Sequence, residues 1–179
     1  SRTRSSVALS RWWASRATEG FAARRRGHVS RGMSPLLRTG SLVGRPVVIQ
    51  DVRLGVAVDA LFDRALGRLV GLDVRCRDEA NRFLPYPACE VFEDRLAVES
   101  PLVLLERELD FYRVGGSGLS GLRGQPVLVA GDALGTLADL VIGPEGEVVR
   151  IVVATPHGQT EIDPGTGVVV GNHALRPAV

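Results

Sequence analysis

Two aspartates that recur at a spacing of 80 residues, Asp59 and Asp139, are the first candidates for chemistry in this chain. Two carboxylates held in one cleft could act as a general acid and a general base. An aspartate at a strand end can instead face solvent or accept hydrogen bonds from turn backbone. We expect the structural role, because catalysis would require both copies to meet in space.

The other polar candidates are isolated along the chain. His157 and His173 could bind a metal together with Glu161 or Asp163, but lone loop histidines are typically solvated. Ser120 is flanked by glycine yet lies outside the G-x-S-x-G pattern of a nucleophile elbow, and we assign it to a hinge. We therefore predict no catalytic residue, no metal site, no cofactor and no enzymatic activity.

Cysteines and glycines add no recognisable site. Cys76 and Cys89 form no C-x-x-C pair, and we expect reduced, partly buried thiols in a cytoplasmic protein. A disulfide would require Cα atoms within about 7 Å, which the sequence leaves open. A phosphate-binding P-loop is excluded, because the chain has no G-x-x-x-x-G-K-[ST] string and no lysine. The recurring glycines are interpreted as turn residues: Gly44, Gly55, Gly124 and Gly135. Of these, Gly55 and Gly135 are expected to require a positive φ.

The elements that position these residues come from an internal duplication. Residues 41–55 read SLVGRPVVIQDVRLG, and residues 121–135 read GLRGQPVLVAGDALG. A repeat at a fixed offset predicts two copies of one small β module that superpose on each other. The main local difference is expected in the turn at 143–146, which is one residue shorter than its counterpart at 63–67.

Apolar runs that alternate or are rich in β-branched residues predict short strands separated by glycine and proline turns. The expected strands are 46–49, 56–62, 68–76, 95–98, 126–130, 134–142, 147–154, 159–162 and 168–170. The turn after residue 62 is expected to use a positive φ at Gly67. Leu102, Leu105, Leu109 and Tyr112 recur at helical spacing, so a short helix is predicted over 103–113, with a flexible hinge at 115–118.

The basic character is concentrated at the N-terminus. Residues 1–32 hold eight arginines and one acid, whereas the remainder holds 14 arginines and 19 acids. All 22 basic residues are arginine, as a GC-rich genome would produce. Residues 1–35 are predicted to be a disordered basic tail. The tail could bind nucleic acid or anionic lipid through Trp12 and Trp13, be an arm without a partner, or be an artefact with the true start at Met33.

The predicted organisation is a tail at 1–35, a first module at 36–101, a helix and hinge at 102–120 and a second module at 121–175. No apolar run approaches the ~20 residues that a membrane-spanning helix needs. Nucleic-acid binding by the folded region is not expected, because acids outnumber arginines there and binders usually carry a basic stripe.

The order L-x-G-x-P-V, then L-G, then an apolar strand, a glycine turn and a second apolar strand resembles the PRC-barrel family. That family is named after the photosynthetic reaction centre H subunit and includes a domain of the bacterial ribosome maturation factor. Phe83-Leu84-Pro85 is similar to the family's extended segment before its closing strand. The resemblance covers roughly residues 40–100 and 121–171. It implies a mainly β protein with two small PRC-like β-barrels in tandem, joined by a short helix and a glycine-rich hinge.

Glycine, proline and aliphatic residues carry this resemblance, so it implies a docking surface and no catalytic signature. We expect a non-enzymatic protein-docking module; the alternative is an RNA- or ribosome-associated maturation factor. Phe83, Tyr86 and Phe92 could form an exposed contact patch in their proline-rich context, or they could fill the core.

Overall fold

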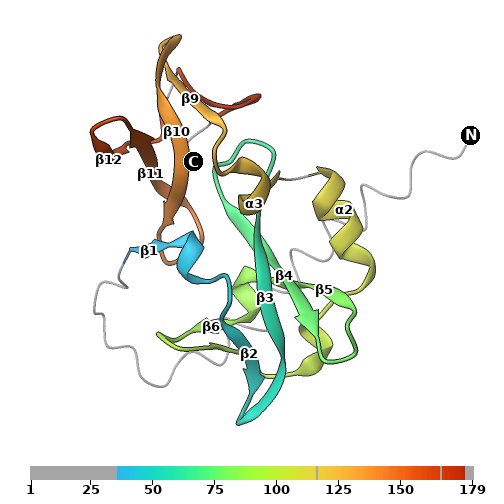
Figure 1. Ribbon diagram of the computed structural model, residues 1–179. Helices are drawn as coiled ribbons and strands as arrows, with labels where there is room; N and C mark the ends of the chain where they lie inside the picture. Colours follow the sequence, from blue (N-terminus) through green and yellow to red (C-terminus); the bar gives the residue numbers. More distant parts are fainter. Residues whose placement is uncertain (1–35, 116, 166, 176–179) are drawn as a thin grey trace, which may run out of the picture. The chain divides into compact units, whose positions relative to one another are not determined.

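The computed structural model describes residues 36–115, 117–165 and 167–175 (Figure 1). The predicted tail, with Trp12, Trp13 and Met33, lies outside the described residues. The described chain is mainly β and forms two sheets of seven strands each, so the predicted fold class is confirmed at this level. In the part of the chain that is described, no helix is both long and apolar enough to cross a membrane.

The first sheet has the strand order β5-β4-β3-β2-β7-β6, with β8 paired to β3. Its strands are β2 (Pro46–Ile49), β3 (Val52–Phe62), β4 (Leu69–Cys76), β5 (Asn81–Pro85), β6 (Glu90–Val91), β7 (Leu96–Ala97) and β8 (Ser117–Gly118). The central strand β3 is 11 residues long, and its inward side is filled by small and aliphatic residues. This alternation is the usual signature of a half-buried strand.

The second sheet has the strand order β12-β11-β10-β9-β13-β14, with β1 paired to β10. Its strands are β9 (Pro126–Val129), β10 (Asp132–Ile142), β11 (Val148–Thr155), β12 (Gly158–Ile162), β13 (Val168–Val170), β14 (His173–Ala174) and β1 (Leu37–Arg38). Both sheets are open paths of strands among the described residues, and neither closes into a barrel.

The two sheets repeat each other residue by residue, as the duplication predicts. Val47 pairs with Gly55 and Val127 with Gly135, and both ladders shift register at the adjacent position. Beyond the β3–β4 turn the offset falls from 80 to 79, so Asp59 pairs with Asp73 and Asp139 with Val152. The turn that is one residue shorter is thereby confirmed. The modules differ in β7, which pairs parallel to β2, whereas β13 pairs antiparallel to β9.

The helices are short, and two predictions between the modules are wrong. They are η1 (Thr39–Ser41), η2 (Tyr86–Ala88), η3 (Pro101–Val103), α2 (Arg107–Gly115) and α3 (Leu119–Leu122). The helix predicted over 103–113 begins at Arg107, because Leu105 exchanges two backbone hydrogen bonds of 2.8 Å with Phe83 in β5. The predicted hinge is not free at Ser117–Gly118, because β8 is held by pairing with β3.

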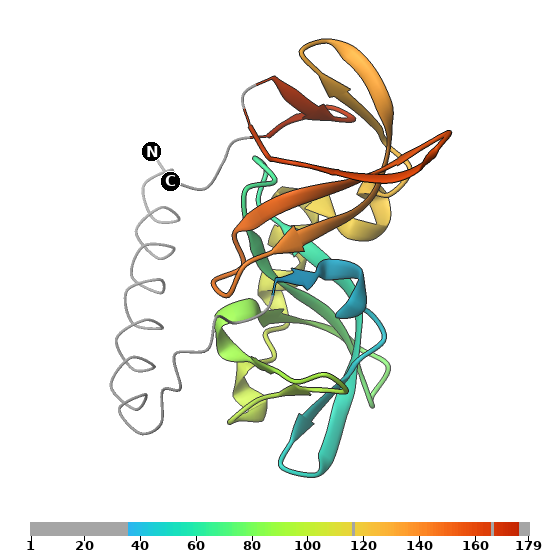
Figure 2. The same cartoon turned by 90° about the vertical axis from the view of Figure 1, so that its left-hand side faces the viewer.

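β1 and β8 are exchanged between the sheets. Leu37 pairs with Ile142, and 80 residues later Ser117 pairs with Phe62. The start of each repeat therefore adds to the sheet of the other repeat, and a short helix, η1 or α3, follows each exchanged strand. Figure 2 shows β1 and η1, in blue, beside the orange strands of the second sheet.

A single apolar core joins the two sheets. Phe62 and Leu72 of the first sheet and Leu140 and Ile151 of the second belong to one buried cluster. Backbone hydrogen bonds also cross between the two β-turns: Leu69 N–H donates to Gly146 (2.8 Å) and Val148 N–H donates to Gly67 (2.9 Å). A small module buries too little surface to be stable alone, and the shared core relieves that limit.

The glycine predictions need correction. Gly55 and Gly135 do not adopt a positive φ; the left-handed positions are Gly44 (φ 90°) and Gly124 (φ 81°). A Cβ on Gly55 would lie 2.5 Å from the Arg75 carbonyl oxygen, so glycine is required there for close strand approach. In the turn after β3 the positive φ lies at Leu66 (φ 51°) and not at Gly67.

Candidate functional site

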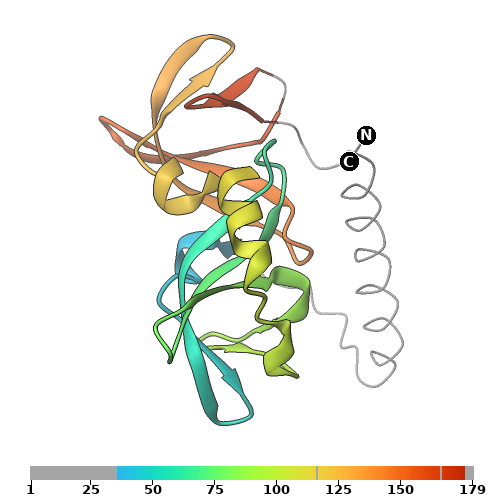
Figure 3. The ribbon, with the colours of Figure 1, turned by 90° about the vertical axis from the view of Figure 1, so that its right-hand side faces the viewer.

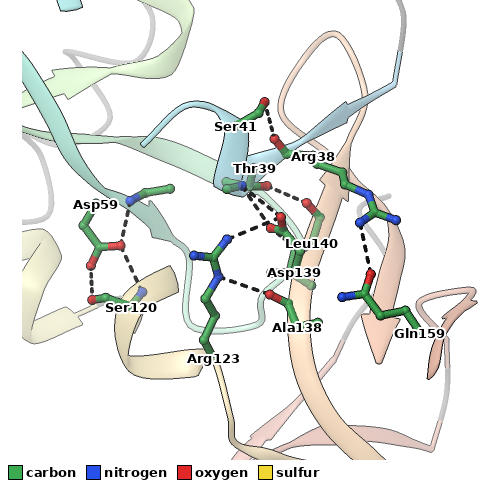
Figure 4. A network of polar contacts seen from close by, with 12 residues as sticks. Arg38, Thr39, Ser41, Asp59, Ser120, Arg123, Ala138, Asp139, Leu140 and Gln159 are labelled. Carbon is green, nitrogen blue, oxygen red and sulfur yellow. Dashed lines mark hydrogen bonds and ion pairs between the residues drawn. The ribbon is translucent and has the colours of Figure 1, made fainter. Parts of the chain in front are cut away.

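Asp59, the first of the recurring aspartates, holds the start of α3 (Figure 4). Its Oδ1 accepts from the Ser120 backbone N–H (3.0 Å), and its Oδ2 accepts from the Ser120 hydroxyl (2.5 Å). The Ala60 N–H donates to the same carboxylate at 2.8 Å. Ser120 thus belongs to α3 and anchors the exchanged segment, in place of the hinge role assigned from sequence.

Asp139 does the same work for η1, on the other side of the exchange. Its Oδ1 accepts from the backbone N–H groups of Gly40 (3.0 Å) and Leu140 (2.8 Å). Arg123 approaches its Oδ2 at 3.4 Å. Gly40 is the counterpart of Ser120, so both aspartates accept hydrogen bonds from the segment that follows an exchanged strand. The structural role is confirmed for both residues, because each carboxylate is used at its own junction.

The junction at Asp139 is the more buried of the two. Asp139 is 8% exposed, and Thr39, fully buried, donates its hydroxyl to the Leu140 carbonyl at 2.8 Å. Arg38 reaches from β1 to Gln159 (3.2 Å) and Glu161 (3.0 Å) on β12, as Figure 4 shows for Gln159. These contacts fasten β1 to the second sheet.

The histidines and their acidic neighbours are separate in space. Glu161 pairs with Arg38, and Asp163 pairs with Arg150. The ring of His173 lies 3.1 Å from the Ser117 hydroxyl, while His157 shows a backbone hydrogen bond to Thr155. Within the described ranges, no three His, Cys, Asp or Glu side chains gather closely enough to hold a metal ion.

Both cysteines are free thiols in the described structure. Cys76 is buried at the end of β4, and Cys89 is half-buried after η2. Burial raises the pKa of the Cys89 thiol to about 12, so the thiol is protonated at neutral pH and is a poor nucleophile.

The three aromatic candidates do not form one patch. Phe83 is 1% exposed and Tyr86 is 8% exposed, so both are core residues. Phe92 is the exposed member of the set, and the Arg95 guanidinium lies 4.7 Å from its ring centroid. A contact role stays a prediction for Phe92 alone.

Helix α2 is fastened to the first sheet by three different interactions (Figure 3). The Arg113 guanidinium pairs with Asp73, which is 4% exposed and also accepts from Asn81 (2.8 Å). The Tyr112 ring stacks on Phe83 with centroids 4.2 Å apart. Leu109 is buried in the same small cluster. Arg113 also neutralises Asp73, which lies directly opposite Asp59 in the ladder.

The outer face of α2 is apolar and exposed. Phe111 is 69% exposed and Val114 is 84% exposed, and their spacing of three residues places them on one side of the helix. Leu102, in η3, is 83% exposed although the helical pattern predicted it to be on the buried stripe. We call Phe111 and Val114 the α2 outer face. Sequence reasoning missed it, although both residues fall off the predicted stripe of Leu105, Leu109 and Tyr112.

The comparisons with known proteins add no identity. No protein-family model matches the chain, and no curated protein matches its sequence.

Proposed function

We propose that this chain is a non-enzymatic docking protein whose two modules are PRC-barrel-like and whose partner binds the α2 outer face. The observation that carries the proposal is an exposed apolar pair on a rigidly held helix. Phe111 is 69% exposed, yet its neighbour Tyr112 stacks on the core and Arg113 pairs with a buried aspartate. A helix that is fixed in place while exposing an aromatic side chain is typical of a binding face, since aromatic anchors dominate interface energies.

The repeated register of the two sheets supports the PRC-barrel-like assignment. Both modules carry the proline-led strand, the long central strand and the returning strand in the same order. Their open sheets depart from a closed barrel. Fold alone does not supply function, so the docking role depends on the α2 outer face.

The charges around α2 favour a protein over nucleic acid. Glu108 and Asp110 lie in its first turn, and Glu106 precedes it. Carboxylates beside a contact surface repel a phosphate backbone, which binds through converging cations. The alternative function, an RNA- or ribosome-associated factor, would need a basic surface elsewhere.

The test is affinity capture from an RNase-treated lysate of the native host. Wild-type chain, Phe111→Asp and Leu36→Asp are compared, because Leu36 is also exposed and apolar (58%) but lies outside α2. We expect one protein to be enriched by the wild type and Leu36→Asp and lost with Phe111→Asp. Thermal unfolding of each variant checks that the fold is kept.

The proposal fails if the captured protein is insensitive to Phe111→Asp, or if capture disappears with RNase treatment. The second result would instead favour the RNA- or ribosome-associated function.

A further inference from the structure

Two adjoining hollows lie at the end of the first sheet, where the β2–β3 hairpin meets the β4–β5 turn. Both are lined by Arg53, Cys76 and Arg77. The smaller hollow, of about 360 Å³, adds Val52, Leu54 and Leu104, and the larger adds Val56, Val58 and Arg75. We call the two together the arginine hollow. Its floor is aliphatic and its rim is basic.

Three of its arginines have no partner of their own. Arg53, Arg75 and Arg77 are exposed, and their guanidinium groups make no hydrogen bond or ion pair with any described residue. Arg82 differs, because it pairs with Asp78 (2.6 Å) and Glu106 (2.8 Å). Glu79 adds one carboxylate to the lining, so the free guanidinium groups leave the hollow positive.

The second module shows that the scaffold does not require these arginines. By the register of the strands, Arg53 corresponds to Ala133 and Arg75 to Ala154. Arg77 follows β4 as Pro156 follows β11. The same strands therefore form with small or rigid residues at all three positions. Three guanidinium groups that fold stability does not demand are available for a ligand.

We propose that the arginine hollow binds an extended peptide segment of a partner protein that carries both acidic and aliphatic side chains. A guanidinium group presents a planar fork of donors that matches a carboxylate in two hydrogen bonds. Val52, 56% exposed, and the half-buried Leu54 and Val56 supply apolar contacts between the charges. This inference names the partner's chemistry and rests on the proposed docking function.

Peptide is favoured over single-stranded nucleic acid by the floor of the hollow. Binding of unpaired bases relies on aromatic side chains on which bases stack. The residues that line the arginine hollow include no phenylalanine, tyrosine or tryptophan. Aliphatic side chains suit leucine or valine in a peptide better than they suit bases.

The test measures binding of a fluorescein-labelled dodecapeptide of alternating glutamate and leucine to the full chain by fluorescence anisotropy. A lysine and leucine peptide and a single-stranded RNA oligonucleotide are measured beside it. The variant Arg53→Ala/Arg75→Ala introduces the residues of the second module, so the fold should survive. Arg95→Ala/Arg150→Ala removes the same charge from exposed arginines outside the hollow and is the matched control.

We expect the acidic peptide to bind the wild type and the control equally, and the hollow variant at least tenfold more weakly. The lysine peptide should not bind. Absence of acidic-peptide binding, or equal weakening by both double variants, would overturn the inference. RNA binding that is lost only in the hollow variant would overturn it in favour of nucleic acid. The α2 outer face is intact in every variant, so these failures are distinct from failure of the docking proposal.

Discussion

Replacing Asp139 by alanine tests the exchange of strands between the sheets. Asp139 accepts from the backbone N–H of Gly40 (3.0 Å) and of Leu140 (2.8 Å), in surroundings where it is only 8% exposed. A buried donor that loses its acceptor costs about 1–3 kcal/mol. Two such donors give an expected loss of about 2–4 kcal/mol in the free energy of unfolding, a large part of the ~5–15 kcal/mol that a domain has.

Asp59 is the matched comparison within the same chain. Its partner Ser120 is exposed, so water can replace the lost hydrogen bonds, and Asp59→Ala should cost about 1–2 kcal/mol. Asp139→Asn keeps an acceptor oxygen and loses mainly the contact with the half-exposed Arg123 (3.4 Å), which such ion pairs limit to about 1 kcal/mol.

The assay is urea unfolding followed by circular dichroism, with thermal unfolding beside it. For a chain of this size each kcal/mol shifts the Tm by roughly 2–4 °C. The expected order of loss is Asp139→Ala, then Asp59→Ala, then Asp139→Asn. If Asp139→Ala were as stable as the wild type, or less damaging than Asp59→Ala, the argument that these carboxylates fasten the exchanged segments would be refuted.

Three further predictions concern stability. Gly55→Ala should cost about 1–3 kcal/mol, because its Cβ would lie 2.5 Å from a backbone oxygen, whereas Gly44→Ala, with open space around it, should cost about 1 kcal/mol from its positive φ alone; urea unfolding that ranks them in reverse would contradict this. The folded state raises the Cys89 pKa from 9.0 to about 12, so its contribution to stability is complete below pH 9 and is lost between pH 9 and 12; a pH series should fall less steeply for Cys89→Ala, and an unchanged slope would refute the assignment. A chain that begins at Met33 should melt within about 2 °C of the full chain, and a loss above about 4 °C would show that residues 1–32 stabilise the fold.

The duplication made the sheets predictable from the sequence. Proline-led apolar runs and the offset of 80 residues predict β2, β3 and β4 and their counterparts β9, β10 and β11, with the shorter turn after Ile142. Local pattern and internal comparison both point to these strands, so their prediction succeeds.

The exchange of β1 and β8 was not predictable in the same way. Each strand is two residues long and carries no periodicity, and its partner lies about 60 or 100 residues away along the chain. Ser117–Gly118 was predicted to be a hinge because glycine composition indicates flexibility, whereas pairing with β3 decides its conformation.

The candidate surfaces depend on tertiary placement. Arg53 and Arg75 lie on neighbouring strands and Arg77 on the following turn, so only the ladder brings them to one hollow. One signal was present in the sequence: Arg53 faces Ala133 in the aligned repeats. Phe83 and Tyr86 fill the core, because the extended segment that holds them lies on the inner side of the first sheet.

The measurement that tests the docking account most directly is the affinity of the purified partner, once captured, for the wild-type chain, Phe111→Asp and Leu36→Asp. Isothermal titration calorimetry should give a dissociation constant at least tenfold weaker for Phe111→Asp, or about 1.4 kcal/mol. Leu36→Asp should bind as the wild type does. Equal affinity of all three proteins would contradict the claim that the α2 outer face is where this protein docks.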